Sequence, residues 1–219
     1  FQVNTNIYGN QQSPISTFLN DGGFVISWSK VYTSISAQMY DAAGDTIGDE
    51  FKVHTGRPGP YSPSITTLNN DNFVITWTEG SPEGDIYAQI YDAAGSIVED
   101  EFLVNTTTVS AQHKSDITAL NDGGFVISWT SNIQDGSGNG IFAQMYDASG
   151  NTVEDEFQVN TYTDNHQKYS STTALNDGGF VVTWESSGQD GDGQGIYAQI
   201  FNANGTTQGS EFQVNTYTT

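Results

Sequence analysis

The sequence NDGGFVISW occurs at residues 20–28 and again at 121–129, and close variants of it occupy residues 69–77 and 176–184. In every copy a group of Asn, Asp and Gly residues precedes an apolar run that ends in tryptophan. Asn, Asp and Gly accept the left-handed backbone of tight turns, and alternating apolar side chains are typical of a β-strand. The stretch therefore predicts a tight turn followed by a short strand, four times in one chain.

Two other elements recur in step with this strand. A segment of the type IYAQIYDAAG follows each tryptophan, and the pentapeptide FQVNT or a variant of it begins at residues 1, 51, 102, 157 and 212. These starts are 50, 51, 55 and 55 residues apart, a period found in propellers and repeat arrays. We therefore predict a single repeat domain, with residues 1–5 as an extra copy of the closing strand. Its units are about residues 6–55, 56–106, 107–161 and 162–216 of the 1–219 chain.

Each unit has the pattern of four short antiparallel strands, with Gly and Asn turns between them and no helical stretch. The predicted fold class is all-β, with four repeats of about 50 residues that each form a four-stranded sheet. Both faces of the second and third strands carry apolar groups, so each sheet needs cover on both sides. The blades of a four-bladed β-propeller provide that cover. A linear stack of the same units is the alternative.

Composition narrows the range of partners. The chain has 26 Asp and Glu residues against 5 Lys and Arg residues, a formal net charge of -21, which repels nucleic acid and anionic membrane surfaces. The sequence has no run of about 18 apolar residues, so we expect no membrane insertion. Cysteine is absent. Because the chain begins at Phe1 without a signal peptide, we expect a mature or excised piece of a longer protein.

The segments NDGGFVISW, QDGSGNGIFAQMYDASG and DEFQVNT together cover the elements that every unit shares. They resemble the tandem repeats of large secreted bacterial calcium-dependent exoproteins and adhesins, and the resemblance covers nearly all of the chain. It implies a secreted or cell-surface location, outside a bacterial cell, and a binding or adhesive role. It supplies no catalytic residue that can be carried over to this chain.

Acidic, glycine-rich loops between the second and third strands of units three and four are candidate calcium sites. Calcium binds six to eight oxygens on a flexible loop, and calcium is the one cofactor that we expect. The candidate ligands are Asp135, Ser137, Asn139, Asp190 and Asp192. The alternative is a solvated turn in which the Asp residues support hairpin geometry.

Aromatic and amide side chains give two kinds of prediction. Tyrosines that break the repeat are the candidate carbohydrate ligands, and we expect them in variable loops: Tyr32, Tyr61, Tyr162 and Tyr169. The tryptophans that close the second strand are expected in the core rather than on a sugar platform: Trp28, Trp77, Trp129 and Trp184. The repeated glutamines are expected to be buried and hydrogen-bonded, with a ring of sugar-binding amides as the alternative: Gln38, Gln89, Gln144 and Gln199.

Motifs for catalysis are absent from the sequence. The EDEF clusters at 99–102 and 154–157 are expected at the exposed start of an outer strand, where they prevent edge pairing, rather than as an acid and base pair. The chain has no Cys and no G-x-S-x-G motif, and His54, His113 and His166 lie in different repeat contexts. We therefore expect that the protein is not an enzyme.

Two functions remain from the sequence alone. The first is a non-catalytic extracellular binding module, lectin-like or adhesive and calcium-assisted, whose partner is a glycan or a cell-surface polymer. The alternative is a structural subunit of an extracellular array or filament. In that case the surplus FQVNT copy leaves an open edge, through which the terminal strands self-associate.

Overall fold

The computed structural model describes residues 1–5, 7–31, 33–54, 59–80 and 84–217, and its strands form four blades. Blade 1 consists of β1 (Gln11–Phe18), β2 (Phe24–Lys30), β3 (Ser34–Tyr40) and β4 (Thr46–His54). Blade 2 consists of β5 (Tyr61–Thr67), β6 (Phe73–Glu79), β7 (Asp85–Tyr91) and β8 (Ile97–Leu103). Blade 3 consists of β9 (Gln112–Ala119), β10 (Phe125–Asn132), β11 (Asn139–Tyr146) and β12 (Thr152–Gln158). Blade 4 consists of β13 (Gln167–Ala174), β14 (Phe180–Ser187), β15 (Gln194–Phe201) and β16 (Thr207–Gln213).

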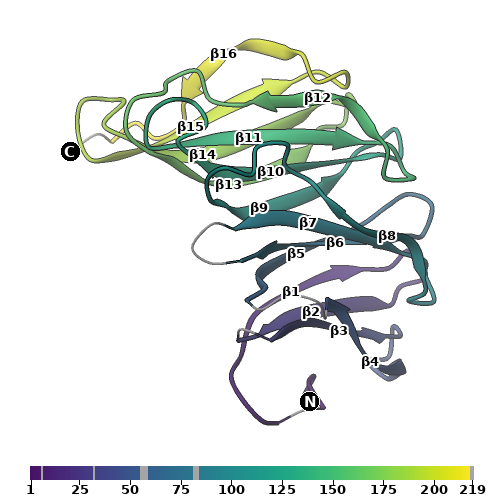
Figure 1. Ribbon diagram of the computed structural model, residues 1–219. Helices are drawn as coiled ribbons and strands as arrows, with labels where there is room; N and C mark the ends of the chain where they lie inside the picture. The colour runs from purple at the N-terminus through teal and green to yellow at the C-terminus, as the bar shows by residue number, and fades with distance from the viewer. Residues whose placement is uncertain (6, 32, 55–58, 81–83, 218–219) are drawn as a thin grey trace.

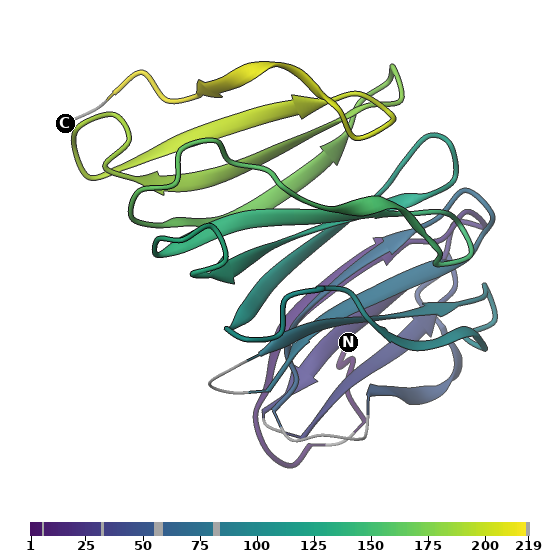
Figure 2. The ribbon, with the colours of Figure 1, turned by 45° about the horizontal axis from the view of Figure 1, so that its top comes forward.

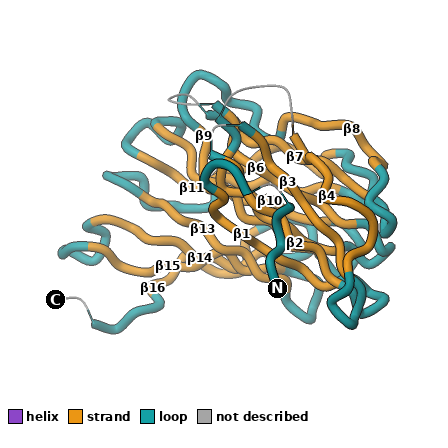
Figure 3. The backbone as a smooth tube through the Cα atoms, turned by 90° about the horizontal axis from the view of Figure 1, so that it is seen from below, coloured by secondary structure: helices purple, strands orange, loops and turns teal. Residues whose placement is uncertain are grey.

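Each blade is an antiparallel sheet whose strands lie side by side in chain order. The blades succeed one another from purple to yellow in Figure 1, and the tilted view in Figure 2 shows blades 3 and 4 apart, while blades 1 and 2 overlap below them. The first strands of consecutive blades lie next to one another, β1 beside β5, β5 beside β9 and β9 beside β13. The fold is therefore propeller-like, and the prediction of an all-β chain with four four-stranded sheets is confirmed. In the described residues, drawn in Figure 3 as strands and loops, no helix is long and apolar enough to cross a membrane.

Three hydrophobic clusters join the blades, each between one blade and the next. In the middle cluster, blade 2 contributes aliphatic side chains such as Val74 and Ile90, and blade 3 contributes aromatic ones such as Phe125 and Trp129. Aromatic rings bury large apolar areas, so they dominate the energy of such seams. The alternation seen in the sequence thus places the aliphatic face of each blade against the aromatic face of the following one.

The fourth strand of each blade lies earlier in the sequence than predicted. In blade 3 it spans Thr152–Gln158, so it starts directly after the turn and ends inside the FQVNT segment. The EDEF cluster therefore lies in the middle of an exposed edge strand, not at its start. Glu154 has a left-handed φ of 59° at a register shift of this strand. Bulges and charges of this kind discourage pairing with other strands, in agreement with the predicted role of the acidic cluster.

The first FQVNT copy lies on blade 1 without forming a strand. Phe1 contacts Tyr40 with ring centroids 5.3 Å apart, just as Phe157 of blade 3 contacts Phe201 of blade 4 at 5.3 Å. Thr5 donates its backbone N–H and its hydroxyl to Glu50 Oε2 at 2.8 and 2.6 Å. The same pair of bonds recurs at the seams between blades 2 and 3 and between blades 3 and 4. Segment 1–5 thus occupies the place that the end of a preceding blade occupies at the other seams, and this position lends no support to the expected self-association.

The outward face of blade 4 carries apolar side chains that the other blades bury. Val159, near the end of blade 3, is 1% exposed, whereas the equivalent Val214 is 50% exposed. Phe212 and Ile196 on the same face are also exposed. The two valines lie in identical FQVNT pentapeptides, so the difference comes from the packing of a following blade and not from local sequence.

Paired substitutions of these valines measure the contribution of a blade seam. We expect Val159→Ala to lower the free energy of unfolding by about 2 kcal/mol, because it removes buried methylene-sized groups worth about 0.8 kcal/mol each and leaves a cavity. Val214→Ala should change it by less than about 0.5 kcal/mol. Urea denaturation of the two variants compares them directly. Equal losses would contradict the seam assignment.

Candidate functional site

A bulge interrupts the first strand of every blade at the same place. The strand register shifts there in all four sheets, and a non-glycine residue adopts a left-handed backbone. These residues are Ser13, Ser62, Lys114 and Tyr169, with φ of 52°, 52°, 59° and 59°. Such backbone is uncommon outside glycine, and bulges often re-aim side chains next to functional sites. Four equivalent bulges therefore turn side chains toward the region where the first strands meet.

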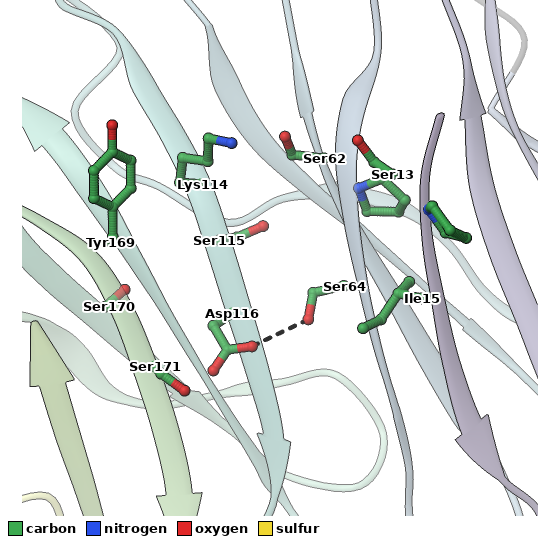
Figure 4. Close-up of a pocket in the computed structure, with 12 residues that line it drawn as sticks. Ser13, Ile15, Ser62, Ser64, Lys114, Ser115, Asp116, Tyr169, Ser170 and Ser171 are labelled. Carbon is green, nitrogen blue, oxygen red and sulfur yellow. Dashed lines mark hydrogen bonds between the residues drawn. The ribbon is translucent and has the colours of Figure 1, made fainter. Parts of the chain in front are cut away.

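These bulges surround a hollow that we call the axial pocket. Its volume is about 340 Å³, within the usual range for small-ligand sites. Three consecutive residues from each blade line it: 13–15, 62–64, 114–116 and 169–171. Figure 4 shows these side chains, contributed by strands of all four blades, around a common space. The radial arrangement of the blades thus produces one composite site that no single repeat contains.

Asp116 is the acidic side chain among the residues that line the axial pocket. It lies on β9 of blade 3 and is partly buried. Thr172 of blade 4 donates its backbone N–H to Asp116 Oδ2 at 2.7 Å, and Ser64 of blade 2 donates its hydroxyl to Oδ1 at 3.3 Å (Figure 4). The carboxyl group therefore connects three blades and at the same time faces the pocket.

Burial raises the pKa of the Asp116 carboxyl above its usual 3.8, while the hydrogen bonds from Thr172 and Ser64 act in the opposite direction. Desolvation disfavours the charged form of a carboxylate. The folded protein therefore keeps a proton on Asp116 at pH values where the unfolded chain has released it. A carboxyl that retains its proton at higher pH is suited to donate it to a substrate.

This pKa shift predicts a pH-dependent contribution to stability. Because the folded-state pKa is raised, the contribution of Asp116 is favourable below pH 3.8 and is lost as the pH rises through the folded-state value. Asp116→Asn stays neutral at every pH and should lack this loss. We expect the stability of the variant, relative to the wild type, to increase from pH 4 towards pH 7 in urea denaturation. Parallel pH profiles for the two proteins would contradict the raised pKa.

The candidate carbohydrate tyrosines lie in different places. Tyr169 lines the axial pocket from β13, and Tyr61 lies on β5 beside the adjoining hollow of about 400 Å³. Both are on strands, so their predicted position in variable loops is wrong for these two residues. Tyr162 lies outside the strands, and Tyr32 falls outside the described residues. Their role in binding carbohydrate stays a prediction.

The Asp-Gly loops form local turns. Asp135 Oδ1 accepts the backbone N–H of Ser137 at 3.1 Å, and Asp190 Oδ1 accepts that of Asp192 at 3.3 Å. Asn139, the remaining candidate ligand, begins β11. Within the part of the chain that is described, these loops contribute to no group of three His, Cys, Asp or Glu side chains within reach of one ion. Calcium at these loops stays a prediction.

The repeated tryptophans and glutamines are buried. The tryptophan side chains are all buried: Trp28, Trp77, Trp129 and Trp184. The glutamines are buried as well: Gln38, Gln89, Gln144 and Gln199. Gln144 donates to the carbonyls of Val153 and Glu154 at 3.4 and 3.0 Å, and therefore fixes the bulge of the outer strand. Gln89 differs, since its Oε1 accepts the hydroxyl of Tyr91 at 2.6 Å. These contacts show that buried amides at this position are hydrogen-bonded within the blade.

The sequence analysis did not identify Asp116 or Lys114 as candidate site residues. In units one and two the corresponding tripeptides are SPI and SPS, in unit three KSD and in unit four YSS. The tripeptide KSD could have indicated a site, because it places two charged residues where the first two units have none. What the sequence did not show is that these four tripeptides meet at one pocket.

Comparisons with known proteins identify the fold. Neither family models nor curated protein sequences give a match to this chain. Among solved structures, a GH93 α-L-arabinofuranosidase of Fusarium graminearum in complex with arabinobiose is similar, with a TM-score of 0.65 and 9% identity over 93% of this chain and 66% of that one. An endo-arabinase from Bacteroides thetaiotaomicron has a TM-score of 0.59 and 12% identity over 93% of this chain and 81% of that one. A xylan β-1,4-xylosidase from Bacillus halodurans has a TM-score of 0.58 and 14% identity over 98% of this chain and 44% of that one.

These similarities correct the functional expectation. Proteins with 9–14% identity share the fold, and the ones named here are enzymes that act on glycans. The expectation of a non-catalytic binding module or a structural subunit, and with it the expectation that the chain is not an enzyme, is contradicted. The sequence analysis considered motifs within single repeats, and it did not show the axial pocket, which residues of all four blades line.

Proposed function

We propose that this chain is a glycan-cleaving enzyme of propeller fold whose reaction takes place in the axial pocket, with Asp116 as the proton donor. The observation that carries the proposal is the Asp116 carboxyl, which faces the pocket with a raised pKa. The similarity in fold to arabinan- and xylan-cleaving enzymes supports it. Protonation of the leaving-group oxygen by a carboxylic acid is the common first step of glycoside hydrolysis.

The described residues that line the pocket do not include the second carboxylate that most glycosidases use. Most glycosidases use two carboxylates about 5 to 9.5 Å apart, but among the described residues that line the pocket Asp116 is the only one with a carboxylate. Tyr169 lines the same pocket, and we assign its ring to packing against the sugar. After Asp116 protonates the leaving-group oxygen, water adds to the anomeric carbon and returns a proton to the Asp116 carboxylate.

The substrate class follows from charge and from the fold neighbours. A formal net charge of -21 repels polyanions, which favours a neutral glycan. The similar structures are named for arabinan and xylan chains, so we propose an arabinose- or xylose-containing polysaccharide. The resemblance of the repeats to secreted bacterial exoproteins supports a place outside the cell, where such polymers occur.

The proposal is tested by hydrolysis of arabinan, xylan and their aryl glycosides by the 219-residue chain, between pH 4 and pH 8. We expect release of reducing sugar from at least one of these substrates. The matched variant Tyr169→Phe keeps the aromatic ring and removes only the hydroxyl, so it should still bind and cleave the substrate, whereas Tyr169→Ala should weaken binding of the substrate. Absence of cleavage of all substrates over this pH range would overturn the proposed activity.

A further inference from the structure

Two hollows meet at the bulges of the first strands. The axial pocket has a volume of about 340 Å³, and the hollow beside it has a volume of about 400 Å³. Both are lined by Ser13, Ser62 and Lys114, three of the four bulge residues with a left-handed backbone. Because a bulge re-aims its side chain, blades 1, 2 and 3 place two hydroxyls and one amine at the border between the hollows.

Lys114 is the only basic side chain among the described residues that line either hollow. Its counterparts in the other blades are Ser13, Ser62 and Tyr169, so the charge at this position is specific to blade 3. Figure 4 shows the Lys114 amine on the side of Ser62 and apart from the Asp116 carboxyl. Within the part of the chain that the structure describes, Lys114 forms no ion pair. Its amine is therefore available to a ligand at the border.

The two serines add hydrogen-bond donors at the same place. Among the side chains drawn in Figure 4, the marked hydrogen bond joins Ser64 to Asp116 and does not use the hydroxyls of Ser13 and Ser62. A Lys ammonium provides three donors, and each Ser hydroxyl provides one. A carboxylate accepts several hydrogen bonds through its two oxygens. The donors at the border therefore match one carboxylate group.

The surroundings of Lys114 are positive in a strongly acidic chain. The chain has 5 Lys and Arg residues against 26 Asp and Glu residues, yet two lysines act on the same imidazole, that of His113 on β9. Burial lowers the pKa of His113, a hydrogen bond with the backbone of Ala111 acts in the opposite direction, and the charges of Lys114 and Lys168 lower it further. Two ammonium groups thus lie near one side of the axial pocket, where they attract an anion.

We propose that Lys114, together with the hydroxyls of Ser13 and Ser62, binds a carboxylate group carried by the glycan. The inference rests on the proposed function and narrows its substrate to a neutral polysaccharide backbone with isolated uronic acid substituents. A polyuronate does not fit, because the formal net charge of -21 repels polyanions. A single Lys ammonium is a compact point charge, and its hydrogen bond to a carboxylate is roughly twice as strong as one between neutral groups.

This carboxylate site determines which bond of the glycan is cleaved. Lys114 and Asp116 both lie on β9, and their side chains line the same pocket. A substituted sugar bound at the border therefore places a neighbouring glycosidic oxygen at the proton donor. Lys114 acts as a binding residue and takes no part in proton transfer.

The test compares two xylo-oligosaccharides of equal length, one of which carries a single glucuronic acid side group. The 219-residue chain should cleave the acidic one with a kcat/KM about tenfold higher, the discrimination expected of one hydrogen bond between charged groups. The preference should decrease as the ionic strength rises. Lys114→Met keeps the length of the side chain and removes its charge, so it should abolish the preference. The control Lys52→Met removes one positive charge from a residue that lines neither hollow, and it should keep the preference.

Calorimetric binding of the same two oligosaccharides to Asp116→Asn separates this inference from the proposed activity. Tighter binding of the acidic oligosaccharide, abolished when Lys114→Met is added, supports the carboxylate site even if the wild type cleaves neither substrate. Cleavage of both substrates with equal kcat/KM, or a preference that Lys114→Met retains, overturns the inference and leaves the proposed activity standing. Equal affinity for the two oligosaccharides, or binding of neither, also overturns it.

Discussion

Asp116→Asn should lower kcat for the best substrate by about 10² to 10⁴-fold, the usual contribution of a general acid. Asn has nearly the same shape as Asp, and its side-chain oxygen still accepts the backbone N–H of Thr172, which lies 2.7 Å from Asp116 Oδ2 in the wild type. The variant keeps the contacts that connect the blades but has no proton to donate. Steady-state kinetics at the pH optimum measure the loss.

The pH profile separates proton donation from a structural role. The wild-type rate should fall as the pH rises through the raised pKa of Asp116, because the deprotonated carboxylate cannot protonate the leaving group. The residual rate of Asp116→Asn should lack this limb. Substrates with good leaving groups, such as nitrophenyl glycosides, should lose less rate than polysaccharides. A uniform loss across substrates and pH would show that Asp116 only holds the blades together.

Trp129→Ala should lower the free energy of unfolding by about 3 to 5 kcal/mol, the largest effect on stability that we expect from one residue. The side chain is fully buried at the seam between blades 2 and 3, at 0% exposure. Its indole N–H donates to Gln112 Oε1 at 3.0 Å. The substitution removes the ring from the cluster and leaves a buried amide oxygen without that donor. Urea denaturation gives the magnitude.

Trp129→Phe distinguishes packing from hydrogen bonding. It keeps an aromatic ring in the cluster and removes only the donor to Gln112, which should cost about 1 to 3 kcal/mol for an unsatisfied buried acceptor plus the change in ring size. Trp129→Ala should therefore be clearly the more destabilising of the two. If both variants retain wild-type stability, Trp129 is exposed in solution and the seam is not formed as described.

The repeat pattern predicted most of the fold because each physical signal was local. Alternating apolar residues define strands, and Asn, Asp and Gly define the turns between them, so the four-stranded blade follows from one unit. The position of tryptophan at the end of the most apolar strand indicated a core residue, and all four tryptophans are buried in the structure. The sequence analysis placed the start of the fourth strand too late. The exposed TVEDEF segment lacks an apolar face, and it pairs with the third strand because a tight turn precedes it.

The candidate site was harder to predict because it depends on contacts between units. Tyr169 and Lys114 occupy left-handed positions in strand bulges, and an alternation pattern does not show where a strand shifts register. Asp116 acquires its raised pKa from burial between blades, which no single unit provides. The candidate calcium ligands Asp135 and Asp190 have the expected spacing in sequence, and each accepts a backbone N–H of its own loop. Calcium at these loops stays a prediction.

The most direct test of the central claim is a crystal structure of Asp116→Asn soaked with an arabino-oligosaccharide or xylo-oligosaccharide. The inactive variant should hold the sugar uncleaved. We predict density in the axial pocket, with a glycosidic oxygen within hydrogen-bond distance of the residue 116 side chain and the ring of Tyr169 beside the adjoining sugar. Sugar bound elsewhere on the protein, with the axial pocket empty at saturating concentration, would contradict the account.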